Sequence, residues 1–539
     1  MTKLGWAVAV AACAAVTGCS SRTDVSAAAT VPPQYTHVWF TVQALWFNTS
    51  STATPEDTTW SKFSLSKPVT LDLASLTSGT LGQIASKLKV PPGTYAQIRL
   101  LPVDETTALT SSASDAGARF NSEADFTDSA GQVHQVPLEL LNPEKGIGVQ
   151  TSIKLKADNN ATSGSDTTAS LAVVLDMHDL ARFDYGTQPG VLLNPHAAAY
   201  DVSATGTIQG TVDLTSLGTS VDAGGRVNVS VTAEGVSSDG TRHVAVRTVP
   251  VATDGTFVLY PLPTDSTTPT TYDLVIHGPR LATVIIKSVP VNVGDPTTTG
   301  VASVGTVPTR AATSFTVNLT ADTQTVPPGA LIGFYQTLPQ SGEIPYLIDE
   351  VPLDPLSGTL FEDHPLSQDT IDFGTYVGGG NVTLATVTPR QGSGTYALAA
   401  QAPLFADGTL TTTAAPPSDG TGTVSATVRA LKPAAGSVAS TLPLTVFTAT
   451  AGKYNHGDVI VSHDGEIIQT ASLDSALAQG GVATMVIGNL PAGDAADVYY
   501  LSFRAWNSRD PAGTLLRQSI PTPADLRSGS NPGLLLIVN

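Results

Sequence analysis

The chain contains few charged residues and almost no cysteine. Charged side chains make up 13% of its 539 residues, about half the usual share. The two cysteines are Cys13 and Cys19, too few for a disulfide framework or a cysteine-based metal site. No apolar run reaches the length that a transmembrane helix requires. Stability must therefore come from core packing, for which a hydrophobic content of 41% is ample.

Sequence motifs of several enzyme classes are also absent. The chain has no G-x-S-x-G, H-E-x-x-H or G-x-x-x-x-G-K-[ST] pattern, which removes the simplest support for a hydrolase, a zinc enzyme or a nucleotide-binding protein. We therefore expect no enzymatic activity and no cofactor. The net charge of −19 repels phosphate backbones, so nucleic acid is excluded as a partner. For the same reason we do not expect a basic patch that adsorbs to anionic lipid.

The first residues resemble an export signal. Lys3 precedes thirteen apolar or small residues, Leu4 to Val16, and Val16-Thr17-Gly18-Cys19 follows. Small residues before a cysteine resemble the lipobox of bacterial lipoproteins, in which cleavage exposes the cysteine for acylation. An ordinary secretory signal with a chance cysteine is the alternative. We expect a signal peptide at 1–18, lipidation of Cys19, and a bacterial cell-envelope location with the lipid as membrane partner. Ser20, where an Asp would resemble an inner-membrane retention signal, favours the outer membrane.

The rest of the chain has the pattern of an all-β protein. Residues 19–34 are small and polar and end near Pro-Pro, which predicts a tether. From residue 35 onward, period-2 segments alternate with turns rich in Gly and Pro, and long amphipathic helices are scarce. The segment HVWFTVQALWF (37–47) has two apolar faces, as expected of a strand covered on both sides. We predict several tandem β-sandwich domains with few short helices.

Residues 35–204 resemble a known bacterial family. Besides HVWFTVQALWF, the matching segments are LDLASL (71–76), VPPGTYAQIRL (90–100), VPLELLNPEKGIGVQTSIKL (136–155) and LAVVLDMHDLARF (171–183). In combination they resemble the domain of unknown function 4382 of exported lipoproteins. This family carries no established activity, so the resemblance implies a β-fold and an envelope location only. The sequence departs from the family pattern at Met177 and His178.

Residues 205–308 resemble a carboxypeptidase-regulatory-like, or prealbumin-like, module. The segments GTIQGTVDL (206–214), VNVSVTAEG (227–235), DGTFVLYPLP (254–263) and YDLVI (272–276) match its strands. The resemblance implies a starch-binding-like sandwich that serves as a spacer or a binding platform. Residues 309–539 match no family that we recognise. Their alternating strands predict a C-terminal β-rich region of one or two sandwiches.

The segment VPPGTYAQIRL raises the choice between a binding loop and a turn that leads into a strand. Pro-Pro-Gly followed by a Tyr-bearing strand has an echo at Gly493 and Tyr500, so we interpret it as architecture. We expect Gly93 to adopt a positive φ and Tyr95 to be a core residue. Period-2 geometry places Tyr95 and Arg99 on the same face of the strand.

Two small groups of residues are candidates for ligand binding. Trp60 and Trp506 are the aromatic rings that we would test as platforms for a carbohydrate. The segment YNHGDVIVSHDGE contains the side chains of a candidate metal site: His456, Asp458, His463 and Asp464. The alternative for this segment is two polar turns, because Asp-Gly is a common hairpin signal. The polar stretch DMHDLARFD, which contains Asp179, is expected to be a solvated turn.

Three functions are compatible with these features. The first is a non-catalytic envelope lipoprotein, a lipid-anchored string of β-sandwiches for scaffolding, display or binding. The second is a carbohydrate-binding lipoprotein that uses the starch-binding-like module or the two Trp residues. The third is a metal-dependent enzyme centred on His456 and His463. An envelope polysaccharide or protein is the expected partner besides the membrane.

Overall fold

The computed structural model describes residues 21–539 with internal gaps. The positions outside the description are 33, 78, 129–130, 157–168, 178, 185–188, 218–226, 266, 299–300, 322–325, 355–363, 369, 381, 413–422, 451, 510–514 and 531–532. Cys19 therefore lies outside the described residues. The described residues form eight β-sheets, so the prediction of an all-β chain is confirmed. In this part of the chain, no helix is long and apolar enough to cross a membrane.

The first domain is a sandwich of a four-stranded and an eight-stranded sheet. Their orders are β12-β9-β1-β4 and β10-β11-β7-β6-β2-β5-β8, with β3 paired to β2. The elements are β1 (Ser21–Thr30), β2 (Tyr35–Asn48), β3 (Ser61–Asp72), η1 (Leu73–Leu76), β4 (Gly82–Val90), β5 (Gly93–Pro102), α1 (Ser111–Ala116), β6 (Glu123–Thr127), β7 (Val133–Glu139), β8 (Ile147–Leu155), β9 (Ala169–Asp176), β10 (Leu180–Asp184), β11 (Pro189–Leu193), β12 (His196–Asp201) and η2 (Val202–Ala204).

The predicted tether is wrong for residues 21–30, because this segment is β1. It lies between β4, to which it runs antiparallel, and β9, to which it runs parallel. Val25, Ala27 and Ala29 point into the sandwich core and are fully buried. A run of small residues looks like a linker in sequence. Here the short side chains of this central strand fit a closely packed layer.

A β-bulge decides which side chains of β2 face the core. The register against both neighbouring strands shifts between Val42 and Ala44, and such a shift exchanges the two faces of a strand. Phe40 and Val42 before the bulge, and Leu45 and Phe47 after it, are therefore all fully buried in one core. An uninterrupted period-2 pattern over residues 37–47 would place Phe40 and Phe47 on opposite faces, and the bulge places them on the same one.

The same effect separates Tyr95 from Arg99 on β5. The register against β8 shifts between Tyr95 and Gln97. Tyr95 lies in the core of the first domain, with its ring 5.6 Å from that of Phe47, and its hydroxyl donates to the carbonyl of Pro91 at 2.7 Å. The predicted core position of Tyr95 is thus confirmed, whereas its shared face with Arg99 is wrong. Gly93 starts the strand without a positive φ, contrary to expectation.

The second domain combines a three-stranded sheet, β16-β13-β19, with a six-stranded sheet, β15-β14-β17-β18-β24-β25. Its elements are β13 (Thr205–Val212), η3 (Leu214–Leu217), β14 (Ser230–Val236), β15 (His243–Pro250), β16 (Thr256–Pro263), β17 (Thr270–Gly278), β18 (Leu281–Val291), β19 (Ala302–Val307), β24 (Ile371–Thr375) and β25 (Ala385–Val387). The last two strands come from far along the chain. β24 runs parallel to β18 and pairs with it over Val284 to Lys287.

The third and fourth domains each contain two sheets. Sheets β23-β20-β28 and β22-β21-β26-β27 belong to the third domain, and sheets β32-β29-β36 and β31-β30-β33-β34, with β35 on β33, belong to the fourth. The third comprises β20 (Ser314–Ala321), β21 (Leu331–Gln336), β22 (Tyr346–Pro352), β23 (His364–Ser367), β26 (Ala397–Gln401), β27 (Thr411–Thr412) and β28 (Thr423–Val428). The fourth comprises β29 (Val438–Thr448), β30 (His456–His463), β31 (Glu466–Ser472), α2 (Asp474–Gln479), β32 (Gly481–Ala492), β33 (Val498–Trp506), β34 (Leu516–Ser519), β35 (Ala524–Asp525) and β36 (Leu534–Val538).

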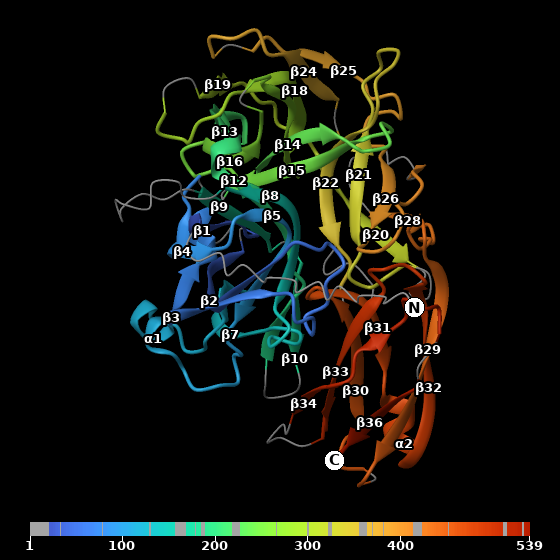
Figure 1. Cartoon of the computed structure of the whole chain (residues 1–539). Helices are drawn as coiled ribbons and strands as arrows, with labels where there is room; N and C mark the ends of the chain where they lie inside the picture. Colours follow the sequence, from blue (N-terminus) through green and yellow to red (C-terminus); the bar gives the residue numbers. More distant parts are fainter. Residues whose placement is uncertain are drawn as a thin grey trace, which may run out of the picture.

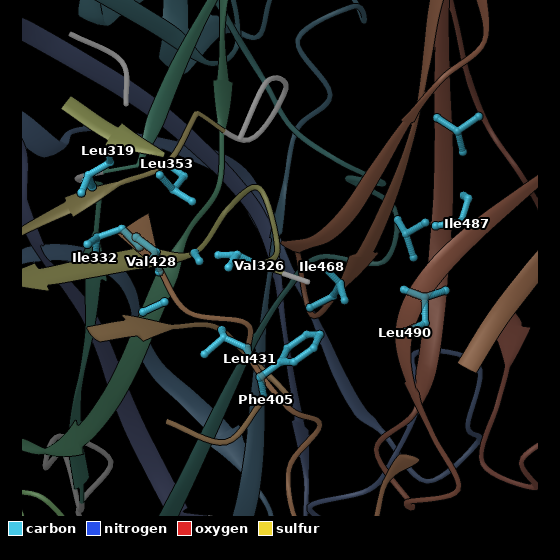
Figure 2. Close-up of a cluster of buried hydrophobic side chains, with 14 of the residues drawn as sticks. Leu319, Val326, Ile332, Leu353, Phe405, Val428, Leu431, Ile468, Ile487 and Leu490 are labelled. Carbon is cyan, nitrogen blue, oxygen red and sulfur yellow. The ribbon is translucent and has the colours of Figure 1, made fainter. Parts of the chain in front are cut away.

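The four domains form a closed arrangement, in which the fourth domain packs against the first, rather than the expected string. Figure 1 shows the first domain in blue to teal, the second in green apart from the orange-brown β24 and β25, the third in yellow to orange, and the fourth, in red, beside both the first and the third. One hydrophobic cluster extends through the third and fourth domains. Within it, Val326, Phe405 and Leu431 of the third domain approach Ile468 of β31 (Figure 2). The fourth domain also contacts the first. Its Arg504 donates to the carboxylate of Glu139, which lies 365 residues earlier in the chain.

Candidate functional site at the junction of the first and fourth domains

The hairpin turn between β30 and β31 inserts against the first domain. His463 pairs with Glu466 across the turn, and Asp464 and Gly465 occupy it with φ of 53° and 96°. The predicted hairpin is therefore present. The Gly148 N–H of β8 donates to the Asp464 carbonyl at 2.8 Å. This backbone contact joins the turn directly to the eight-stranded sheet of the first domain.

A buried ion pair fixes the same turn. The Arg99 guanidinium of β5 binds the Asp464 carboxylate, with side-chain exposures of 2% and 13%. Arg99 also donates to the carbonyl of Lys145 at 3.2 Å. Burial by itself disfavours the charged form of Asp464, but the charges of Arg99 and His463 outweigh it and lower the carboxyl pKa. The Asp464 carboxylate is therefore ionised, and the pair serves as a contact between domains.

Trp60 lies beside this ion pair but is not a platform for a sugar. Its side chain is buried, with 7% exposure, and its indole N–H donates to the carbonyl of Thr54 at 2.7 Å. The guanidinium of Arg99 lies 5.5 Å from its ring centre. Stacking on a carbohydrate needs an exposed ring face, so the prediction of Trp60 as a glycan platform is wrong.

Glu56 joins the two domains a short distance away. Its carboxylate accepts a hydrogen bond of 2.5 Å from the Tyr500 hydroxyl of β33 and pairs with the Lys145 ammonium at 2.8 Å. Burial raises the pKa of Glu56, but these two partners outweigh that effect and lower it overall. Tyr500 is 4% exposed. Tyr500 nevertheless belongs to the junction and not to a domain core. The core residue that corresponds to Tyr95 is Tyr499, whose hydroxyl donates to the carbonyl of Pro491 at 2.7 Å, so the expected echo at Tyr500 is wrong by one residue.

The Arg99–Asp464 pair and Tyr500 line a pocket of about 30 Å³. Its polar lining includes Gln97, Arg99, Gln150, His463 and Tyr500. A volume of this size holds one or two water molecules and excludes a sugar ring or an organic substrate. The pocket is therefore a gap within the domain junction rather than a ligand cavity.

A second group of ion pairs crosses the junction on the adjoining strands. The Arg504 Nε of β33 lies 2.9 Å from the Glu139 carboxylate of β7, with side-chain exposures of 2% and 7%. Arg517 of β34 contacts the carboxylates of Glu105 at 2.7 Å and Glu139 at 3.6 Å. Burial, with repulsion from Glu139 and Asp104, raises the pKa of Glu105 to about 8 in spite of Arg517.

An apolar cluster completes the contact between the two domains. Side chains of β10 and β11, together with Leu141, pack against β30 and β31 of the fourth domain. The cluster consists of Leu141, Ala181, Phe183, Leu192, Ile460 and Ile467, with Trp506 and Leu515 at its margin. The guanidinium of Arg504 lies 5.3 Å from the ring centre of Phe183. Apolar burial and charge pairing therefore occur side by side.

Asp179 belongs to this junction and is not in a solvated turn as expected. It is fully buried, and its carboxylate accepts from the side-chain amide of Asn194. The side-chain oxygen of Asn194, Oδ1, in turn accepts from the Ile467 N–H at 2.7 Å. Burial raises the pKa of Asp179 to about 7. His196 pairs with Glu466 at 3.1 Å in the same region.

The structure does not assemble the predicted metal site. His456 and His463 lie at opposite ends of β30, about 23 Å apart at the usual rise per strand residue. His456 pairs with Asp474 at 3.0 Å, and burial raises the pKa of Asp458 to about 6. Among the described residues, no three His, Cys, Asp or Glu side chains are grouped as metal ligands. The four-residue metal prediction is therefore wrong.

Trp506 is the remaining aromatic candidate. It is half-buried at the end of β33, and its ring stacks on that of His456 with centres 5.6 Å apart. Part of it packs against the apolar cluster of the junction. Its indole thus contributes to the contact between domains, and the structure does not pair it with Trp60 in one surface.

The sequence patterns did not identify the charged residues that join the first and fourth domains. Arg99, Glu139 and Arg504 each lie within an apolar strand segment, in AQIRLL, PLELL and YYLSFRAW. In a chain with so few charges, a single charge inside a hydrophobic strand is a signal of a buried ion pair. Nothing in the sequence, however, indicates which arginine pairs with which carboxylate.

Comparisons with known proteins add a family match for the first domain. Among solved structures, the chain is similar to a leucine-rich repeat protein from Bacteroides thetaiotaomicron VPI-5482 (13% identity, covering 42% of this chain and 26% of that one, TM-score 0.14). It is also similar to the shaft pilin SpaA from Lactobacillus rhamnosus GG (11% identity, covering 42% and 96%, TM-score 0.16). The chain thus spans about a quarter of the first structure, and no curated protein matches it. Residues 23–195, which begin within β1, match the family described as domain of unknown function (DUF4382).

Proposed function

We propose that this chain is a non-catalytic lipoprotein of the bacterial cell envelope that serves as a rigid scaffold or display unit. One observation carries the proposal. The polar side chains that could have formed a site, such as Arg99, Asp464 and Glu139, are instead buried in pairs between the first and fourth domains. A site for chemistry needs polar groups that a substrate can reach. Here these groups hold two domains together.

The closed arrangement gives such a unit a fixed shape. Each domain contacts two others through its core or through buried polar groups. Arg247 of the second domain, for example, donates to the carbonyl of Ala29 at 2.9 Å and the hydroxyl of Thr30 at 2.7 Å in the first. Relative motion of domains is the usual expectation when contacts are small and polar. Buried ion pairs between the first and fourth domains, and the buried hydrogen bonds of Arg247 between the first and second, oppose that motion and suit a load-bearing or presenting role.

The anchor is the second part of the proposal. The sequence Val16-Thr17-Gly18-Cys19 resembles a lipobox, and acylation of Cys19 would hold the protein at the membrane, in the outer membrane if the host is Gram-negative. One acyl chain binds a membrane only marginally, whereas several chains anchor firmly. The partner in this proposal is an envelope protein or polysaccharide that binds the surface of the domains.

The test of the anchor is labelling in the native host. Wild-type protein should incorporate a fatty-acid probe and fractionate with membranes, and Cys19→Ala should abolish both. Cys13→Ala, which changes the other cysteine, is the matched control and should leave both unchanged. Wild-type protein that is unlabelled and free of membranes would contradict the proposal.

The test of the scaffold role is the recovery of partners from native envelopes. Wild-type protein should recover an envelope protein or polysaccharide after crosslinking. Purified protein should contain no stoichiometric metal and should leave a panel of envelope substrates unchanged. Stoichiometric metal together with turnover of any substrate would contradict the non-catalytic assignment. If the protein binds to a glycan array and Trp506→Ala abolishes this binding, carbohydrate binding would replace scaffolding as the proposed function.

A further inference from the structure

The end of the first domain where β1 begins is formed by four strand ends. Ser21, the first residue of β1, pairs with Val90, the last residue of β4. Three residues later the chain starts β5 at Gly93, which pairs with Leu155 at the end of β8. The start of β1, the end of β4, the start of β5 and the end of β8 therefore lie together.

This end carries a concentration of positive charge. Lys87 and Lys89 of β4 and Lys154 and Lys156 at the end of β8 are exposed, and Arg22 of β1 is the register partner of Lys89. Five of the 26 Lys and Arg residues thus lie at one end of one domain, in a chain of net charge −19.

The acidic groups nearby are fewer. Asp24 is on β1, where its carboxylate accepts from the Lys87 N–H at 2.7 Å. In the sequence, Asp158 and Asp166 lie between β8 and β9, in a segment outside the described residues. Asp201, at the end of β12, is level with Val25 of β1 because both pair with Leu171. Even with all four carboxylates counted, the five cations leave this end positive.

The proposed lipid would be attached at the same end. Cys19 precedes Ser21 by two residues, which an extended chain spans in about 7 Å. Because β1 is a central strand and not a tether, an acylated Cys19 would bring this end of the domain to the headgroups. This step rests on the lipid anchor proposed above.

We propose that this basic end, Arg22 with Lys87, Lys89, Lys154 and Lys156, is a docking surface for anionic lipid headgroups. Lysine ammonium groups are donors to headgroup phosphates, and a few such residues reinforce a lipid anchor. From the net charge alone, we expected no basic patch that adsorbs to anionic lipid. At physiological salt, charges beyond about 8 Å are largely screened, so a headgroup senses these cations and not the acidic surface of the distant domains.

The test uses vesicles and a chain that starts at Ser20, which contains every described residue and carries no lipid. Flotation compares vesicles of phosphatidylcholine alone with vesicles in which phosphatidylglycerol replaces part of it. The variant replaces the four exposed lysines by Gln: Lys87→Gln, Lys89→Gln, Lys154→Gln and Lys156→Gln. The matched control replaces four exposed cations elsewhere, with the same change in net charge: Lys67→Gln, Arg119→Gln, Arg429→Gln and Lys432→Gln.

The wild-type chain should bind the phosphatidylglycerol vesicles, and added salt should release it. Each lysine near an anionic surface contributes about fivefold to partitioning, so the four-lysine variant should bind several hundredfold more weakly. The control variant should bind like the wild type. Equal binding to both kinds of vesicle, or an equal loss in the two variants, would overturn the inference. Absence of lipid on Cys19 in the host would refute the anchor alone, since the vesicle assay does not depend on it.

Discussion

Removal of one partner from the Arg504–Glu139 pair should undock the fourth domain from the first. Both side chains are nearly inaccessible, at 2% and 7% exposure. Arg504→Met keeps most of the side-chain volume but leaves the Glu139 carboxylate buried without its nearest cation. Loss of one member of a buried pair costs about 3–5 kcal/mol. Arg517, 3.6 Å from Glu139, compensates in part, so we expect a value near the lower limit.

A double variant separates the charge effect from the packing effect. Arg504→Met combined with Glu139→Leu removes both charges and leaves apolar groups of similar volume. Replacement of a whole buried pair is often neutral or stabilising. We therefore expect the free energy of unfolding of the double variant to lie within about 1 kcal/mol of the wild-type value. The coupling energy between the two substitutions would then be far above that of independent sites.

The assay is equilibrium denaturation followed by tryptophan fluorescence. Trp60 lies beside Arg99, and Trp506 lies at the edge of the apolar cluster, so both report on this junction. Because a four-domain chain need not unfold in one step, the first transition is the relevant one. The control is Arg527→Met, which breaks the exposed pair with Asp525 at 42% and 47% exposure and should cost at most about 1 kcal/mol. An Arg504→Met variant as stable as this control would refute the reasoning.

Three further predictions concern single side chains. Glu105→Gln should flatten the pH dependence of the melting temperature: the folded pKa of about 8 exceeds the ordinary 4.5, so the stabilising contribution of Glu105, complete below pH 4.5, is lost as pH rises through about 8. A wild-type melting temperature as flat as that of the variant over this range would contradict it. Gly93→Ala should change the free energy of unfolding by less than about 0.5 kcal/mol, because the new Cβ would meet nothing closer than 3.9 Å. Gly146→Ala should cost at least about 1 kcal/mol, because Gly146 has a φ of +73° and the Leu100 carbonyl oxygen would lie 2.7 Å from the new Cβ. Equal effects of the two substitutions in thermal melts would refute the distinction. In denaturant titrations, Tyr95→Ala should lower the free energy of unfolding by about 3–5 kcal/mol. Tyr95→Phe, which loses only the hydrogen bond to Pro91, should lower it by about 1 kcal/mol. A Tyr95→Ala variant with wild-type stability would show that Tyr95 is not a core residue.

The fold class followed from the sequence because strand periodicity and turn residues are local signals. The faces of individual strands did not follow, because single-residue bulges near Gln43 and Ala96 exchange them. A bulge depends on the partner strand and has no reliable signature in one strand alone. The segment SAAAT of β1 was read as a linker for a related reason: its burial depends on β9, which begins at Ala169.

The candidate site was predicted less well than the fold. Metal and sugar chemistry were inferred for His463, Asp464 and Trp60 from residue type, and all three lie at the junction of the first and fourth domains. Arg99, the partner of Asp464, lies 365 residues earlier in the chain. Residue types indicate what a side chain can bind, whereas only the packing of domains shows that the binding capacity is already used internally.

The pairing of β24 with β18 means that units of sequence and units of structure do not coincide. A fragment cut at the apparent boundary near residue 308 would lose β24 and β25 and leave β18 as a bare sheet edge, Val284 to Lys287. Open edges of this kind promote intermolecular strand pairing. Recombination that exchanged the second domain alone would meet the same obstacle. The second and third domains are therefore expected to be inherited, expressed and lost together, as one segment of the gene.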